Sequence, residues 1–397
     1  MKKHKLPKGF LAGGIHCGAK KKRKDLSLFY SEKPCRVAAC FTTNAVKAAP
    51  LVLTCEQLKK TGGWARAVVV NSGHANCMTG SRGLNDARKM AKTMAELINV
   101  PKDMVLVSST GVIGVPIPMK PVIKGMKRLV SALSTDGLID AADGIMTTDF
   151  FRKITSRTFV LDGKKIRMTA VGKGAGMIEP NMATMLCYIL TDAAVSAGVM
   201  KKALSGSVGV SFNALTVDGD MSTNDTVMLL ANGAAGNKTV KWHGKDLEVF
   251  RENLDSICID IARMVARDGE GAEKFMEVCV RGARSRKDAG KIAKSVAGSL
   301  LVKCAVLGGD PNWGRIASSA GASGVVFDPE KMEIKLDGVT FLRKGSFAAP
   351  DKKRITPVFK GKDVLIEIDL HGGKAAAVVF SCEISKKYIR MNAHYTT

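Results

Sequence analysis

The chain has 397 residues, of which 46% are hydrophobic and 24% charged, and its formal net charge is +25. This length allows two or more domains with a sizeable core. No apolar run approaches the roughly 18 residues of a membrane helix, and the apolar segment 10–15 is too short for a signal peptide. We therefore expect a cytoplasmic protein rather than a membrane or secreted one.

The surplus of basic residues could serve nucleic acid, but aromatic residues make up only 5% of the chain and no nucleic-acid-binding module is visible. The run Lys20–Lys24 resembles a nuclear-localisation or nucleic-acid patch. A solvated loop is the simpler interpretation, because the other lysines are scattered along the chain. A basic field would still attract anionic amino acids.

The cysteines and histidines do not predict a metal site. None of the ten cysteines forms a Cys-x-x-Cys pair, and no His-Glu-x-x-His is present among the six histidines. Several cysteines fall inside apolar runs, which indicates buried free thiols in a reducing compartment. These are Cys187, Cys258, Cys279 and Cys304.

Strands and helices alternate through the first half of the sequence, which predicts an α/β fold. Apolar residues recur at helical spacing between Gly83 and Asn99, and Pro101 ends that helix. The strand 104–108 ends in Ser109-Thr110-Gly111, which is polar and flexible. Further strands are expected at 9–15, 26–30, 37–41, 67–71, 158–161 and 165–171, and further helices at 120–133 and 137–147.

The centre of the chain joins a loop to a strand. Residues 172–181 contain three glycines and Pro180, which favour a loop, whereas 185–190 is a compact apolar run typical of a buried strand. Thr184 lies at this junction. By itself it is an ordinary strand residue, but such a junction can place a hydroxyl at the mouth of a cleft.

The second half predicts helices at 196–204, 256–268 and 289–301, strands at 364–370 and 375–380, and a terminal tail 392–397. The polar segment 216–226 looks like a calcium loop but lacks the closing glutamate, so we reject that interpretation. The small and basic residues 282–287 indicate a domain boundary.

Several motifs together resemble one family. The segments 173–177 and 180–186 are similar to the self-cleavage segment of the ornithine acetyltransferases (glutamate N-acetyltransferases). The motifs 71–76, 108–114, 218–226 and 310–316 extend the resemblance over nearly the whole chain. His74, where the family often has asparagine, and the basic run Lys20–Lys24 depart from it.

The resemblance implies a four-layer αββα catalytic body over 1–281, similar in logic to N-terminal-nucleophile hydrolases. It also implies a smaller C-terminal α/β domain over 287–397, whose tail reaches the active site. The chain is expected to cut itself between Ala183 and Thr184 into an α chain (1–183) and a β chain (184–397). Two of each are expected to form a heterotetramer.

The same resemblance makes Thr184 the nucleophile. Its hydroxyl attacks the carbonyl of Ala183, and the resulting ester is hydrolysed. The released α-amino group, with a pKa of about 7.7–8.0, then serves the hydroxyl as a base. No cofactor and no metal are needed for this chemistry.

The other site residues are carried over from the family one by one. Thr110 and Gly111 match the oxyanion hole, which suits their position at a strand end. Lys173 matches a substrate-binding lysine suited to an α-carboxylate, and Glu270 a glutamate that pairs with a substrate ammonium. The remaining matches are Thr147, whose register is left open by the adjacent Thr148, and the C-terminal pair Asn392 and Thr397.

The expected function is transfer of the acetyl group from N2-acetylornithine to glutamate, in arginine biosynthesis. In bifunctional members acetyl-CoA is a second donor, and the sequence does not decide whether it is one here. Two alternatives stay open: an aminopeptidase or amidase with the same nucleophile, and a basic nucleic-acid-binding protein. A nucleotide site at 172–176 has only an incomplete glycine fingerprint.

Overall fold

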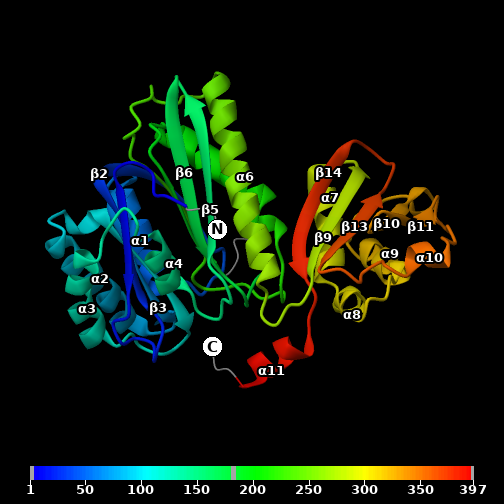
Figure 1. Cartoon of the computed structure of the whole chain (residues 1–397), viewed down its shortest axis with the longest axis horizontal. Coiled ribbons are helices and arrows are strands. Elements are labelled where there is room, and N and C mark those ends of the chain that lie inside the picture. The colour runs from blue at the N-terminus through cyan, green and yellow to red at the C-terminus, as the bar shows by residue number, and fades with distance from the viewer. Residues whose placement is uncertain (1–3, 180–184, 395–397) are drawn as a thin grey trace.

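The computed structural model describes residues 4–179 and 185–394 and contains two mixed sheets (Figure 1). The larger sheet has eight strands in the order β4-β3-β2-β8-β7-β6-β5, with β1 paired to β2. The smaller sheet has six strands in the order β12-β11-β10-β13-β9-β14. The predicted α/β class is confirmed.

The long strand β2 (Leu26–Phe41) joins the two halves of the larger sheet. Its first part pairs with β1 and β3, and its last part pairs with β8, with a register irregularity between Tyr30 and Cys35. One half-sheet therefore contains β1 (Phe10–Ile15), β3 (Trp64–His74) and β4 (Val105–Val112). The other contains β5 (Lys153–Leu161), β6 (Lys164–Lys173), β7 (Leu186–Thr191) and β8 (Thr226–Ala231).

Alternating side chains place these half-sheets face to face, because successive residues of a strand point to opposite faces. Val68 of β3 and Tyr188 of β7 share one core, and the rings of Phe29 and Tyr188 meet there with centroids 4.8 Å apart. Val69 packs with α2 and α3 in a second core, and Ile189 with α5 and α6 in a third. These cores account for the αββα order of layers.

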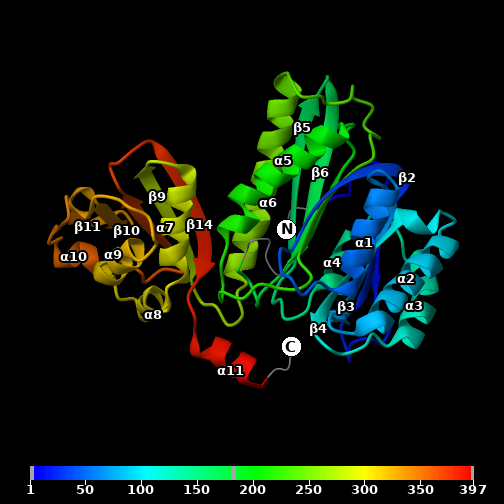
Figure 2. The same cartoon turned by 180° about the vertical axis from the view of Figure 1, so that it is seen from behind.

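The helices of this body lie outside the two half-sheets, except for α4, which packs into the central core. Figures 1 and 2 show α1, α2 and α3 on one side and α5 and α6 on the other. Their bounds are α1 (Ala49–Lys60), α2 (Gly80–Leu97), α3 (Met119–Ser131), α4 (Leu138–Ile145), α5 (Ala197–Val210) and α6 (Lys245–Arg267). Short 3-10 turns η1 (Lys102–Met104) and η2 (Phe212–Ala214) complete the body.

The smaller sheet has its own core, in which Val278 of β9 and Ile366 of β13 pack against Ile292 of α7. Its strands are β9 (Phe275–Ala283), β10 (Glu333–Leu336), β11 (Val339–Arg343), β12 (Ser346–Phe347), β13 (Asp363–Asp369) and β14 (Ala375–Cys382). Its helical segments are α7 (Arg286–Gly298), α8 (Leu300–Gly308), α9 (Trp313–Gly321), η3 (Pro329–Lys331) and α10 (Lys352–Ile355), followed by α11 (Lys386–His394). Pairing in the smaller sheet begins at Phe275, so strand β9 crosses the predicted domain limit at residue 281. The predicted domain limits of 281 and 287 stay a prediction.

Several local features differ from the sequence-based expectation. The predicted helix 289–301 is two helices, because Ser299 ends α7 and its side chain caps α8. Residue 392 lies in α11 rather than in an irregular tail. Helix α6 starts at Lys245, before the expected 256, and neither α1 nor β8 was predicted. Within the described residues no helix is long and apolar enough to cross a membrane.

Candidate active site

A cavity of about 160 Å³ lies where β4 and β6 end, between the larger sheet and α11. Six of the predicted site residues line it, although they are spread from position 110 to 392. They are Thr110, Gly111, Thr147, Lys173, Glu270 and Asn392. The predicted nucleophile Thr184, its neighbour Ala183 and the terminal Thr397 lie outside the described residues.

The predicted oxyanion donors, Thr110 and Gly111, lie at the end of strand β4. Gly111 has φ +130°, and a Cβ there would come within 2.2 Å of the backbone of Gly73 in β3. Only glycine allows this close approach of the two strands. The hydroxyl of Thr110 accepts a hydrogen bond from Lys173 Nζ at 3.2 Å, which leaves its own hydrogen for a ligand.

Lys173, the last residue of β6, is a buried cation at the cavity. Its side chain is only 4% exposed, and no carboxylate within the described ranges lies at ion-pair distance from its Nζ. Burial lowers the pKa of Lys173, an effect that the charge of Asp149 partly opposes. A buried cation costs free energy unless it is paired, so this position favours an anionic ligand.

A buried ion-pair network, which the sequence did not reveal, holds the neighbouring segments. Lys153 is fully buried and donates to Asp149 at 2.7 Å and to Asp268 at 2.5 Å. Asp149 also accepts the N–H groups of Thr147 (2.9 Å) and Gly174 (2.7 Å). The network therefore connects the loop of Thr147, the residue after Lys173 and the end of α6.

Burial by itself would raise the pKa of Asp149, but the cations of Lys153 and Lys173 outweigh it and hold that pKa well below its usual range. Asp149 is thus ionised at neutral pH.

The position of Asp149 beside Thr147 was visible in the sequence. Nothing in the sequence marked Lys153 or Asp268, because the three groups are brought together only by folding.

Glu270 also lines the cavity. Asn392 of α11 donates its side-chain N–H to Glu270 Oε2 at 2.9 Å, and the main-chain N–H of Glu270 donates to Ala175 at 2.9 Å. A side chain at Gly176 would collide with the carboxylate, since its Cβ would come within 2.5–2.7 Å. A glycine at 176 therefore leaves the room that Glu270 needs to face the cavity.

The polar segment 216–226, which had looked like a calcium loop, instead supports the cavity wall. The two oxygens of Asp218 accept the N–H groups of Met177 (2.6 Å) and Ile178 (2.7 Å). Asn224 donates to the carbonyls of Ala75 (2.7 Å) and Ser109 (2.8 Å). In the part of the chain that the structure describes, no group of three or more acidic, histidine or cysteine residues could hold a metal.

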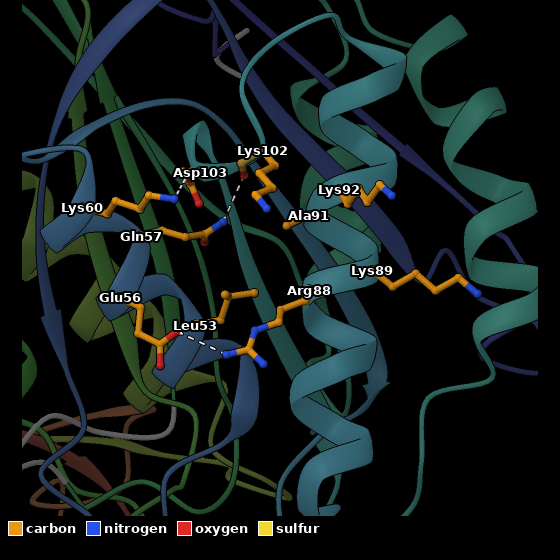
Figure 3. A pocket seen from close by; sticks show the side chains of 10 residues that line it. All are labelled: Leu53, Glu56, Gln57, Lys60, Arg88, Lys89, Ala91, Lys92, Lys102 and Asp103. Carbon is orange, nitrogen blue, oxygen red and sulfur yellow. Dashed lines mark hydrogen bonds and ion pairs between the residues drawn. The ribbon is translucent and has the colours of Figure 1, made fainter.

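A larger cavity of about 550 Å³ lies elsewhere, between α1 and α2 (Figure 3). It contains no predicted site residue, and neither serine, threonine, cysteine nor histidine lines it. Its two acidic groups are already engaged: Asp103 by Lys60 at 2.5 Å and Glu56 by Arg88 at 3.7 Å. It therefore offers no nucleophile, whereas the smaller cavity brings six predicted site residues together and is the candidate active site.

Together the fold and the cavity define a class of protein. The body is a four-layer α/β structure, and its cavity combines hydroxyl donors, a buried cation and an oriented carboxylate. These groups suit an enzyme that binds a small molecule carrying both charges and stabilises an oxyanion.

Comparison with known proteins gives the family. The ArgJ family model matches residues 11–397, so the chain belongs to the ArgJ family. The "Arginine biosynthesis bifunctional protein ArgJ" of Caldanaerobacter subterraneus subsp. tengcongensis is 45% identical, over 100% of this chain and 98% of that protein. The protein of the same name from Geobacter sulfurreducens is 45% identical, over 98% of this chain and 99% of that protein.

A crystal structure of the arginine biosynthesis bifunctional protein argJ from Bacillus halodurans is also similar. It is 37% identical with a TM-score of 0.51, and the match covers 52% of this chain and 98% of that one. The predicted family is therefore confirmed, and with it the predicted class of enzyme, an acetyltransferase of arginine biosynthesis.

Proposed function

We propose that this chain is a self-processing glutamate N-acetyltransferase, which moves the acetyl group of N2-acetylornithine to glutamate through an acetyl-Thr184 intermediate. One observation carries the proposal. Six matched residues, distant in sequence, line a single cavity, and β7 begins two residues after Thr184. The start of β7 and the groups expected to serve Thr184 thus belong to the same end of the larger sheet.

The charges around the cavity fit the substrates. We assign the α-carboxylate of acetylornithine to the buried cation of Lys173, which has no other carboxylate partner in the described ranges. The side-chain ammonium of ornithine is assigned to Glu270, whose carboxylate Asn392 orients at 2.9 Å. Glutamate offers the same α-carboxylate to Lys173 when it enters as the acceptor.

The chemical steps follow from these assignments. The Thr184 hydroxyl attacks the acetyl carbonyl while its proton moves to the Thr184 α-amine, and the Thr110 hydroxyl and Gly111 N–H stabilise the oxyanion. Ornithine leaves with the proton, and the acetyl group stays on Thr184 as an ester. The amine of glutamate then attacks that ester and regenerates the hydroxyl.

Self-cleavage and assembly are part of the proposal. The solved Bacillus halodurans chain is covered to 98% by only 52% of this chain, so it is about half as long, as a β chain of 184–397 would be. The heterotetramer of two α and two β chains and the cytoplasmic location rest on the family resemblance. The word "bifunctional" in the relatives' names supports acetyl-CoA as a second donor.

Intact-mass analysis of the wild type and of Thr184→Ala tests the proposal. The wild type should give two chains, 1–183 and 184–397, whereas the variant should stay whole and transfer no acetyl group. Thr191→Ala, at the far end of β7, is the matched control and should be cleaved normally. A wild-type chain that stays continuous and still transfers acetyl groups would refute the mechanism.

Incubation with acetylornithine alone separates transferase from hydrolase. A transferase should release one equivalent of ornithine per Thr184 and then stall until glutamate is added. Continuous release of ornithine and acetate would instead indicate the amidase alternative.

A further inference from the structure

The basic run Lys20–Lys24 has no role in the mechanism above, yet one of its residues contacts a segment of the cavity wall. The sequence left two interpretations open for this run, a nucleic-acid patch and a solvated loop. Lys20 fits neither interpretation, because it is half-buried and its Nζ donates a hydrogen bond to the carbonyl of Met146 at 2.8 Å. Met146 directly precedes Thr147, one of the residues that line the cavity.

A buried carboxylate fixes the main chain that carries Lys20. Asp25 is fully buried, and its side chain accepts three N–H groups. The donors are Cys17 (2.6 Å), Gly18 (3.1 Å) and Lys20 (2.8 Å). Burial by itself would raise the pKa of Asp25, but these hydrogen bonds outweigh it and lower that pKa. The loop 16–25 is therefore a built structure rather than a solvated coil.

The side chain of Lys20 passes the end of strand β3 on its way to Met146. Gly73 of β3 pairs in register with Gly111, a predicted oxyanion donor. A Cβ at Gly73 would come within 2.8 Å of Lys20 Cγ, so the aliphatic stem of Lys20 packs directly on this glycine. One side chain thus contacts both the strand beside the oxyanion segment and the segment that leads to Thr147.

The charge of Lys20 belongs to the surroundings of the cavity. Burial lowers the pKa of Lys20 to about 8; the charge of Asp25 opposes this shift and that of Lys173 adds to it. A partly buried ammonium group needs hydrogen-bond acceptors, and its acceptor among the described residues is the carbonyl of Met146. This contact therefore offsets the cost of keeping the cation where it is.

Thr147 is held in place through its main chain. Its N–H donates to Asp149 at 2.9 Å, and its carbonyl accepts a longer hydrogen bond of 3.4 Å from the exposed Arg23. Lys20 holds the carbonyl that comes before it. Because the main chain determines where a side chain starts, these contacts decide how the Thr147 hydroxyl is presented to the cavity.

We infer that Lys20 is a positioning residue, which sets the place of Thr147 in the cavity through its hydrogen bond to the carbonyl of Met146. This inference rests on the proposed function, in which Thr147 is one of the matched residues around the substrate. Lys20 itself does not line the cavity, so its effect on the substrate passes through Thr147.

Hydrogen exchange tests the contact without any turnover. Lys20→Met keeps the aliphatic stem on Gly73 but removes the donor, and Lys20→Gln is too short to reach Met146. In both variants the main-chain amide of Thr147 should exchange faster, on the order of 10-fold, because its segment opens more often. Lys20→Arg keeps the charge and the donor and should restore most of the protection.

Steady-state kinetics test the consequence. In Lys20→Met the KM for acetylornithine should rise on the order of 10-fold, while kcat should stay near the wild-type value, because a charge-assisted hydrogen bond that supports binding is lost. Thr147→Val removes the hydroxyl that Lys20 is inferred to position. The double variant should therefore have the KM of Thr147→Val alone, whereas a general structural role of Lys20 would make the two effects multiply.

Lys24→Met is the matched control. It removes one cation from the same basic run, but the Lys24 ammonium contacts Asp140 of α4 and not the segment of Thr147. Its exchange and its KM should be those of the wild type. Wild-type exchange or KM in Lys20→Met and Lys20→Gln, an equal rise in Lys24→Met, or multiplying effects in the double variant would overturn the inference. A wild type that transfers no acetyl group would instead refute the proposed function, and the exchange experiment would still test the contact.

Discussion

The two sheets use ion pairs of similar geometry in opposite surroundings. At the active-site end of the larger sheet, Lys153 is fully buried and contacts Asp149 at 2.7 Å. In the smaller sheet, Arg281 of β9 contacts Asp369 of β13 at 2.8 Å, but its side chain is 51% exposed. Distance therefore does not distinguish the two pairs, whereas access to water does.

This difference determines what each pair contributes. Water screens the exposed pair and solvates its partners when the contact breaks, so little free energy depends on it. The buried pair is surrounded by protein, and removing one partner leaves an uncompensated charge. We infer that the buried network maintains the shape of the cavity, whereas the exposed pair contributes little to the stability of the smaller sheet.

Replacing Lys153 by Met should have the largest effect. It leaves Asp149 and Asp268 buried without their shared cation, and breaking such a pair costs about 3–5 kcal/mol of unfolding free energy. In the wild type, the lowered pKa of Asp149 means that its stabilising contribution is present at neutral pH and is lost as the pH falls through the folded-state value. The difference between variant and wild type in urea unfolding should therefore narrow in acid, and an equal difference at every pH would contradict this explanation.

Replacing Lys173 by Gln should have an intermediate effect, on binding rather than on folding. A hydrogen bond to a charged group contributes about 1.5–3 kcal/mol, so KM for acetylornithine should rise by about 10- to 100-fold. Because burial lowers the pKa of Lys173, the wild type should lose affinity at a lower pH than an ordinary lysine would, as the ammonium gives up its proton. The variant should lack this alkaline limb, and steady-state kinetics over a pH series measure both effects.

Replacing Arg281 by Gln should have the smallest effect. An exposed pair contributes about 0–1 kcal/mol, so urea unfolding should shift little and acetyl transfer should be unchanged. This variant is also the control for Lys153→Met, since both remove one cation from a carboxylate pair. A loss of unfolding free energy as large as that of Lys153→Met would show that solvent exposure does not determine how much each ion pair contributes.

The sequence predicted the individual site residues through the family resemblance, which rests on short motifs. The motif around Thr110 and Gly111 and the polar segment 218–226 are short and specific, so each can be recognised without knowing its neighbours. The same holds for Glu270, which follows the end of a predicted helix. Even the strand after Thr184 was visible, because the apolar run Leu186–Leu190 is compact and bounded by a loop.

The supporting groups were not predictable in this way. Lys153 looked like any other lysine of a strongly basic chain, and Asp268 like an acid at the end of a predicted helix. Strand β8 and helix α1 were not predicted, although both carry local signals: β8 is a compact apolar run, and α1 has Pro50 in its first turn. The role of each supporting group depends on a partner that lies far away along the chain.

The sequence by itself determined the class of fold, the family and the motifs that carry the chemistry, because local pattern and residue type are properties of short segments. Only the tertiary structure decided which charges are buried, which are paired and which are left without a partner. That difference is physical: solvation and electrostatic energy depend on what surrounds a group in three dimensions, and the chain order does not specify those surroundings.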